Sequence, residues 1–247
     1  MSSSNKIAYH ARSISLPTRS HPLDAAVEEQ LCKLRTSDLT SSVSNNLVVL
    51  KDLYQCVEDL LSTEDGKCLD AVLERSVMLL DVCGTIKDIL SQMKQSAQDL
   101  QSSIRRRSNE FEAYMSSRKK VCKVIQKCLS DLKKISNKKN DLVTDVLTEV
   151  DATTLAVFES VLCFLSGPKQ NNWSLVSKLT IKHATQQVVN EVTKVDSALK
   201  SKVIEAKEVQ KPLAALEMNL KDLEDGLESV FRCLIKNRVS LLNILNH

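Results

Sequence analysis

A stripe of lysines is the feature of this sequence whose spacing most clearly predicts binding chemistry. Its members recur every three or four residues and are Lys120, Lys123, Lys127, Lys134 and Lys138. In an α-helix this spacing places the ammonium groups along one face, beside the apolar stripe of the same helix. Asp131 interrupts the run, and the wider segment 105–139 holds twelve Lys and Arg against three acids.

Such a face could bind anionic lipid headgroups, an acidic protein or nucleic acid. Nucleic acid is the least favoured ligand, because no aromatic residues alternate with the charges to stack on bases. The alternative interpretation is an ordinary solvated helix face, paired with acidic helices of the same protein. That alternative has a source of acids, since the chain outside residues 105–139 and the first 23 residues carries a net charge of −9.

A second candidate site is Ser15, in the Ser-rich and acid-free start of the chain. The surrounding residues are Arg12-Ser13-Ile14-Ser15-Leu16-Pro17, the R-S-x-S-x-P spacing that 14-3-3 proteins bind after phosphorylation of the second serine. A phosphate at Ser15 would add nearly two negative charges for an arginine cluster of the partner, and Pro17 would turn the chain out of the groove. A tail rich in Ser and Arg also produces such a match by chance. An organelle transit peptide is a third interpretation.

The cysteines and histidines do not have the spacing of a metal site or a disulfide framework. The cysteines are Cys32, Cys56, Cys68, Cys83, Cys122, Cys128, Cys163 and Cys233. No C-x-x-C pair occurs among them, and the four histidines are not at ligand spacing from them. Several of these thiols fall on apolar helix positions, where cysteine behaves as a small hydrophobe. We therefore expect no bound metal and a reducing, cytoplasmic compartment.

The motifs of common enzyme classes do not occur in the chain. It has no Gly-rich phosphate loop, no G-x-S-x-G and no H-E-x-x-H, and Trp173 and His183 are single residues. No stretch approaches the roughly 20 apolar residues of a membrane span, and the nearest one, 155–165, contains Glu159. We expect a non-enzymatic protein without a cofactor, in the cytoplasm or at a membrane surface.

The amino-acid composition predicts that the candidate binding residues lie on helices. Four Gly and four Pro in 247 residues are too few for many turns, and 3% aromatic residues favour narrow helix-to-helix contacts. We predict an all-α fold, an elongated bundle of long, coiled-coil-like antiparallel helices. Residues 1–22 are predicted to be a disordered, basic, Ser-rich tail, and residues 23–247 a single elongated helical domain.

The regularity of one heptad pattern predicts a long helix in the first half of the chain. From Leu69 to Ile104 every position at alternating spacings of three and four is apolar except Ser76. The same phase continues to Ile135, so an unbroken helix over 69–135 would be a rod on the order of 100 Å long. A bend near residues 105–109 is the alternative.

A second pattern keeps one phase from Val188 to Ile244, with a kink expected at Pro212. It includes four positions at which a seam could bind a partner helix: Leu227, Leu234, Asn237 and Leu241. A buried Asn237 could fix the register of the seam, whereas an Asn237 in a frayed helix end would simply be solvated. The matching patterns predict antiparallel pairing of the two long helices, either within one chain or in a homodimer.

Shorter helices are expected over about 23–34, 46–61 and 141–166, the last of them ended by Gly167 and Pro168. Gly84 and Gly226 fall inside predicted helices, where each costs up to ~1 kcal/mol relative to Ala. We expect the close approach of a neighbouring helix to compensate at both positions.

Several segments of the chain resemble one known family. They are Leu79-Leu80-Asp81-Val82-Cys83-Gly84, Ile89-Leu90-Ser91-Gln92-Met93-Lys94, Ser117-Arg118-Lys119-Lys120-Val121, and the C-terminal stretches 223–229 and 238–245. They resemble a plant-specific family of unknown function that includes the BYPASS proteins. The resemblance implies a protein of plant root and shoot development, with no catalytic residues to carry over. The region after Trp173 is shorter than is usual in that family.

Together these observations predict a helical interaction protein that presents helix faces to protein partners. The alternative is a peripheral membrane protein whose basic helix binds anionic lipids.

Overall fold

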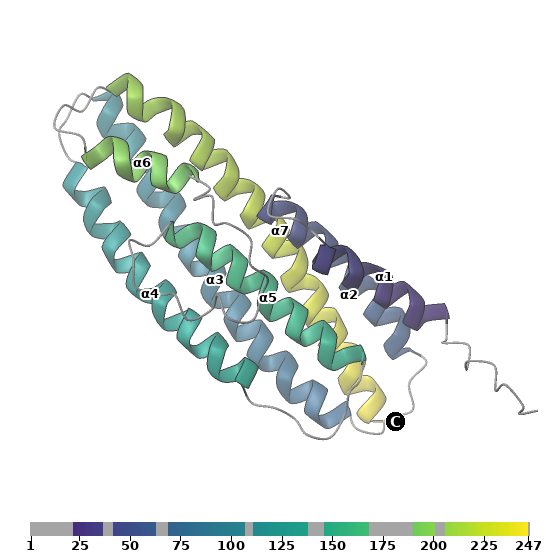
Figure 1. Cartoon of the computed structure of the whole chain (residues 1–247). Coiled ribbons are helices and arrows are strands. Elements are labelled where there is room, and N and C mark those ends of the chain that lie inside the picture. The colour runs from purple at the N-terminus through teal and green to yellow at the C-terminus, as the bar shows by residue number, and fades with distance from the viewer. Residues whose placement is uncertain are drawn as a thin grey trace, which may run out of the picture.

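The computed structural model describes residues 22–36, 42–62, 69–106, 111–137, 146–167, 190–200 and 206–246. Its elements are α1 (Pro22–Thr36), α2 (Val43–Leu61), α3 (Leu69–Arg105), α4 (Phe111–Asn137), α5 (Val146–Ser166), α6 (Glu191–Lys200) and α7 (Ala206–Leu245). Figure 1 shows them as an elongated bundle with the long helices side by side. The prediction of an all-α bundle is therefore confirmed, while the predicted tail, residues 1–22, lies almost wholly outside the described residues.

The longest contact in the bundle is the antiparallel seam between α3 and α7. Polar pairs along this seam are Ser76–Arg238, Lys87–Glu228, Lys94–Glu224 and Gln101–Glu217. Residue numbers rise along α3 as they fall along α7, so the two helices run in opposite directions. The heptad positions of both helices are buried between them, from Leu79 to Ile104 and from Val209 to Leu241. The predicted antiparallel pairing is thus confirmed, and it forms within one chain.

Two shorter helices, α2 and α6, pack beside different parts of α7. Helix α2 packs beside its C-terminal half, where Leu47 lies next to Gly226 and the backbone carbonyl of Tyr54 accepts a hydrogen bond from Asn237. Helix α6 packs beside its N-terminal part, at the opposite end of the bundle (Figure 1). Helix α5 contacts α1, α2, α3 and α4, so its apolar side chains fill the middle of the bundle.

The 69–135 pattern does not form one rod. Helix α3 ends at Arg105 and α4 begins at Phe111 and folds back along it, with the Ser96 and Ser117 hydroxyls 2.6 Å apart. The heptad phase continues across the break because both helices turn the same apolar stripe toward one core. The break falls within the polar segment 105–110, so the alternative bend is correct in position.

The 188–244 pattern is also divided into two helices. Helices α6 and α7 are separate elements that pack against each other, and residues 201–205 between them lie outside the described residues. Pro212 lies inside α7, where the buried Val209, Leu213 and Leu216 keep the predicted register on both sides of it. Helix α5 ends as predicted at Gly167, whose φ of 74° favours glycine.

The two helical glycines have different surroundings. A Cβ at Gly226 would lie 3.1 Å from Cβ of Leu47 in α2, so the predicted close approach of a neighbouring helix exists there. A Cβ at Gly84 would meet nothing within 4 Å. Among the helices that the structure describes, the expectation that a neighbouring helix compensates for Gly84 is therefore wrong.

This contrast predicts different outcomes for a glycine-to-alanine substitution at the two positions. Gly84→Ala should raise the free energy of unfolding by about 0.5–1 kcal/mol, because alanine restricts the unfolded chain and fills open space. Gly226→Ala should lack this gain, because its new methyl group must displace Leu47. Urea denaturation of both variants measures the difference, and equal stabilisation by both would contradict the packing described.

Candidate functional site

The predicted lysine stripe lies on the outer face of α4. Core-facing positions of this helix, such as Val121, Ile125 and Leu132, are buried. The opposite positions carry Lys120, Lys123, Lys127 and Lys134, all exposed. Lys138, the fifth member, lies outside the described residues. We call the four described lysines the lysine face.

Most of the lysine face is not paired with acids of its own chain. Lys134 bonds Asp131 at 2.8 Å, and this hydrogen bond and the positive charge lower the pKa of that carboxyl. Within the described ranges, Lys120, Lys123 and Lys127 form no ion pair. Helix α4 packs mainly against α3 and α5 and reaches α6 through Tyr114 and Arg118. The acidic residues that bind lysines lie mainly on α7 and α2. Pairing with the protein's own acidic helices therefore does not explain these three lysines.

The predicted seam residues of α7 face the inside of the bundle. Leu227, Leu234, Asn237 and Leu241 are all buried, against α2 and α3 of the same chain. They are thus occupied by intramolecular packing. A partner that approaches the C-terminal half of α7 meets other side chains of this helix.

Asn237 is buried rather than solvated. Its Nδ2 donates to the Tyr54 carbonyl at 3.0 Å, and its Oδ1 has no hydrogen-bond partner among the described residues. A cavity of about 30 Å³ lies beside it, lined also by Ser76 and Asp151, and is large enough for one water molecule. Asn237 thus links α7 to the backbone of one particular turn of α2.

Asp151 of α5 is a buried carboxyl in the same region. Its Oδ2 lies 2.8 Å from Nε of Arg75 on α3, and both side chains are mostly buried. Burial raises the pKa of Asp151 to about 6, against the opposing attraction of the Arg75 charge. The sequence pattern did not single out this carboxyl, because its neighbours make α5 an apolar helix.

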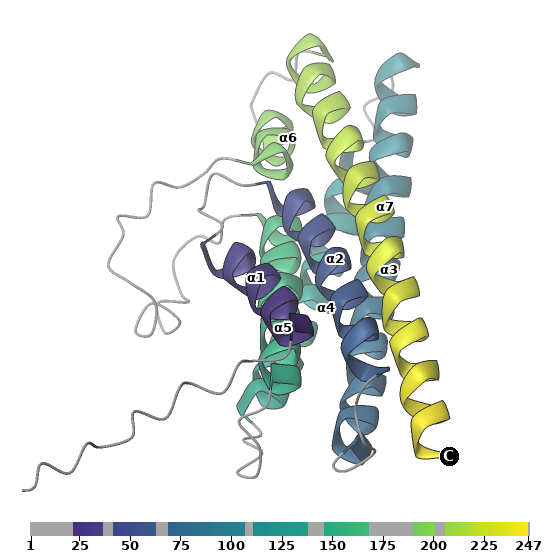
Figure 2. The same cartoon turned by 90° about the vertical axis from the view of Figure 1, so that its right-hand side faces the viewer.

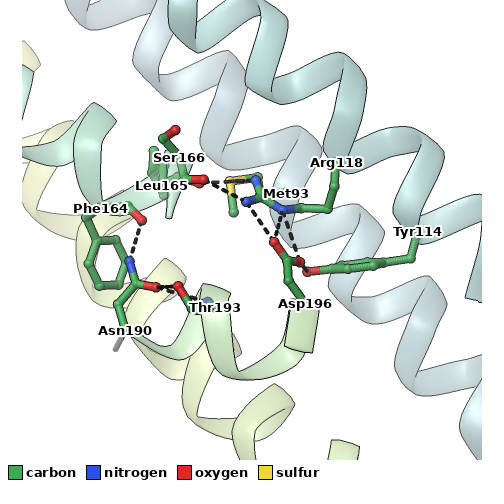
Figure 3. Close-up of polar contacts among 9 residues, drawn as sticks. All are labelled: Met93, Tyr114, Arg118, Phe164, Leu165, Ser166, Asn190, Thr193 and Asp196. Carbon is green, nitrogen blue, oxygen red and sulfur yellow. Dashed lines mark hydrogen bonds and ion pairs between the residues drawn. The ribbon is translucent and has the colours of Figure 1, made fainter. Parts of the chain in front are cut away.

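A buried arginine joins three helices at the end of α5 (Figure 3). Arg118 of α4 is 5% exposed and occupies a heptad position that otherwise carries apolar residues. Its guanidinium donates to the carbonyls of Leu165 and Ser166 at 3.1 Å each, and its Nη2 lies 3.2 Å from Oδ2 of Asp196 on α6. Tyr114 donates to the same carboxylate at 3.3 Å.

The start of α6 completes this junction. Asn190 caps the helix, because its side-chain oxygen accepts hydrogen bonds from the backbone N–H and the hydroxyl of Thr193. The Nδ2 of Asn190 donates to the Phe164 carbonyl at 2.7 Å. The last carbonyls of α5 have no partner within their own helix. Arg118 and Asn190 supply those partners, and the positive guanidinium also matches the negative end of the α5 dipole. We call these residues the Arg118 junction.

The junction is a positioning device rather than an open site. Its charges satisfy one another, and burial, reinforced by Asp196, raises the pKa of Tyr114. Beside it a polar groove of about 620 Å³ lies between α3 and α4, lined by Gln92, Gln95, Ser96, Asp99, Ser102, Arg106 and Ser117 among others. The clue in the sequence is Arg118 itself, the polar residue among the heptad positions of α4 from Phe111 to Ile135.

The remaining predicted features are Ser15, two single residues, possible metal clusters and possible membrane spans. Ser15, Trp173 and His183 lie outside the described residues. Within the described ranges no group of three His, Cys, Asp or Glu residues could hold a metal ion, and the cysteines are free thiols. None of the helices, over the same ranges, combines the length and apolarity that crossing a membrane requires.

Removing the arginine should open the junction. Arg118→Met should lower the free energy of unfolding by about 2–4 kcal/mol, because Asp196 and the α5 carbonyls lose their partner. Hydrogen exchange should accelerate most in α6. Lys119→Met, one residue away and exposed, is the matched control and should change neither quantity. Unchanged exchange in α6 of Arg118→Met would show that the junction does not hold this helix.

Asp151 should make stability fall as pH rises. Its folded pKa of about 6 exceeds the value of about 4 in an unfolded chain, so between these pH values only the folded state holds the proton. The contribution is full below pH 4 and is lost by about pH 6, an effect of about 2–3 kcal/mol. Denaturation at several pH values should show this fall in the wild type relative to Asp151→Asn. Parallel curves for the two proteins would refute it.

The comparisons with known proteins agree with the resemblance found in the sequence. The model of the BPS1 family, described as Protein BPS1, matches residues 46–244, which include helices α3 to α6 and most of α2 and α7. Curated proteins and solved structures gave no match to the chain. Because the matched region covers most of the sequence, the chain belongs to the BPS1 family, the family of the BYPASS proteins that its sequence resembles.

Proposed function

We propose that this protein is a non-enzymatic helical interaction protein of plant root and shoot development, and that it binds an acidic protein partner through the lysine face of α4. Membership of the BPS1 family is consistent with a role in plant development. The observation that carries the proposal is the set of exposed lysines on one helix face, three of which form no ion pair within the described ranges.

The geometry of α4 suits an extended acidic segment. From Lys120 to Lys134 the helix rises by roughly 20 Å, so the ammonium groups form a row rather than a pocket. The helix packs on α3 and α5 along its other side and holds this row in place. A partner that meets a row of fixed charges gains electrostatic attraction without ordering the helix that carries them.

An anionic membrane surface is the second candidate ligand, because the same row could lie on lipid headgroups. One specific observation bears on how it would bind. Val124 is 40% exposed beside the lysines, and it is the one exposed large hydrophobic side chain in the described part of α4. Membrane binding by α4 would therefore be almost purely electrostatic and would be lost in high salt.

Charge reversal on the lysine face tests both candidates. The variant Lys120→Glu, Lys123→Glu, Lys127→Glu changes only exposed side chains and should fold as the wild type does. A matched control reverses three exposed lysines of α7, namely Lys207, Lys211 and Lys221. In plants that lack the protein, the wild type and the control should restore root and shoot growth, and the α4 variant should not.

Sedimentation of the full chain with lipid vesicles separates the two ligands. The proposal expects equally weak binding to phosphatidylcholine vesicles with and without phosphatidylserine. Binding that requires phosphatidylserine and disappears in the α4 variant would transfer the function to the membrane surface. Full rescue of growth by the α4 variant would contradict both candidates, because the lysine face would then be dispensable.

A further inference from the structure

The exposed hydrophobic side chains of the described residues gather on one face of the α3–α7 pair. Seven large hydrophobic side chains are exposed, and four of them are Val77, Ile235, Val239 and Leu242, with exposed fractions of 37–50%. The three on α7 recur at spacings of four and three residues, which places them on one side of the helix. The partly buried Leu73, Leu80 and Phe231 lie along the same side of the pair.

Two contacts show that this side borders the groove between α3 and α7. The Lys87 ammonium lies 4.2 Å from the ring centre of Phe231, and Arg238 donates to the Leu73 carbonyl. Residues one turn from these, such as Val77 and Ile235, therefore flank the outside of the groove. We call Leu73, Val77, Leu80, Gly84, Phe231, Ile235, Val239 and Leu242 the α3/α7 outer face.

No helix of the described residues covers this face. Helix α3 packs against α4, α5 and α7, and α7 packs against α2, α3 and α6. Figure 2 shows the two helices together along one edge of the bundle, with the other helices behind or to one side. Monomeric soluble proteins seldom expose several large apolar side chains together, and such patches commonly bind another protein.

Gly84 makes this face uneven. It lies within α3, where glycine costs up to ~1 kcal/mol relative to alanine. Apart from its chain neighbours and the backbone of its own helix, no described atom lies within 4 Å of where its Cβ would be. Intramolecular packing therefore gives no reason for a glycine at this position. The open space above Gly84 lets another molecule approach the backbone of α3 closely.

The charges at the edges of the face make it complementary to itself. Asp81 on α3 is exposed and forms no ion pair in the described residues. The Arg232 side chain on α7 is 77% exposed, and its Nε lies 2.9 Å from the Glu228 carboxylate of the same helix. The seam pairs Ser76–Arg238 and Lys87–Glu228 set the register, and between them Asp81 is level with Arg232. A twofold axis parallel to the helices would place α3 of each copy on α7 of the other, so Asp81 would meet Arg232 of the second copy twice.

From this arrangement we propose that the α3/α7 outer face binds a second copy of this chain, in a symmetric dimer with α3 packed on α7 of the other copy. The apolar part of the face extends about 17 Å along α3. A strip of this length is small for an interface, because a standard one buries ~800 Å² per partner. The dimer is therefore weak and depends on concentration. The lysine face of α4 is not part of it, so the proposal goes beyond the proposed function.

Analytical ultracentrifugation of the full chain over a concentration series tests the dimer. The wild type should shift from monomer to dimer, and Ile235→Glu with Val239→Glu should weaken association at least tenfold. Met218→Glu, the control, changes a residue of α7 that is 65% exposed and outside the face. It should associate as the wild type does, and so should the triple glutamate variant of the lysine face.

A charge exchange tests the orientation. Asp81→Arg and Arg232→Asp should each weaken the dimer, because each brings like charges together, and the double variant should restore it. Circular dichroism checks that each variant remains helical. The proposal is overturned by a wild type that stays monomeric at all concentrations, since the face would then serve a different partner or none. A dimer that is insensitive to the Ile235 and Val239 substitutions, or a double variant without recovery, would also overturn it.

Discussion

The antiparallel seam between α3 and α7 is the contact on which the rest of the bundle depends. These are the two longest helices, and every other helix except α1 packs on at least one of them. Their leucine-rich heptad positions supply the apolar contact, and the lysine–glutamate pairs along one side allow a single register. Because α7 is longer than any one neighbour, α2 and α6 must divide its length between them.

A separate constraint arises where α5 ends beside the start of α6. The last carbonyls of α5 lie beside the first turn of α6 in a partly buried region, and neither set of groups has partners within its own helix. Arg118 and Asn190 satisfy these groups. A buried guanidinium is expensive to desolvate, and the Asp196 carboxylate and the α5 carbonyls together offset that cost. Arg118, a polar residue in the apolar series of α4, thus serves the end of α5 and the α6 residue beside it.

The helices and their pairing could be predicted from the sequence, because burial on one side imposes the 3.5-residue period directly. The turns could not. Leu69 to Ile135 keeps one phase although the chain reverses between Arg105 and Phe111, since a hairpin and a rod place the same residues on the apolar side. Periodicity reports which side of a helix is buried, and it carries no information on which helix covers it.

The same limit explains which site residues could be found. The lysine face was predictable, because exposed residues at helical spacing remain on one face wherever the helix packs. The packing partner of Leu227 and Leu234 was not predictable, because an apolar seam has the same sequence pattern whether its partner helix is in the same chain or in another. Arg118 and Asp151 needed the fold, since their partners are 78 and 76 residues away in sequence.

The topology also turns an uneven charge distribution in the sequence into separate surfaces. Helix α4 carries most of the basic segment and contacts α3 and α5, and these two helices lie between it and α7. The glutamates of α7 therefore reach Lys87 and Lys94 of α3 but not the lysines of α4. If α4 packed beside α7, its lysines would be neutralised within the chain and the surface would be inert. The hairpin between α3 and α4 is thus what leaves the lysine face available to a partner.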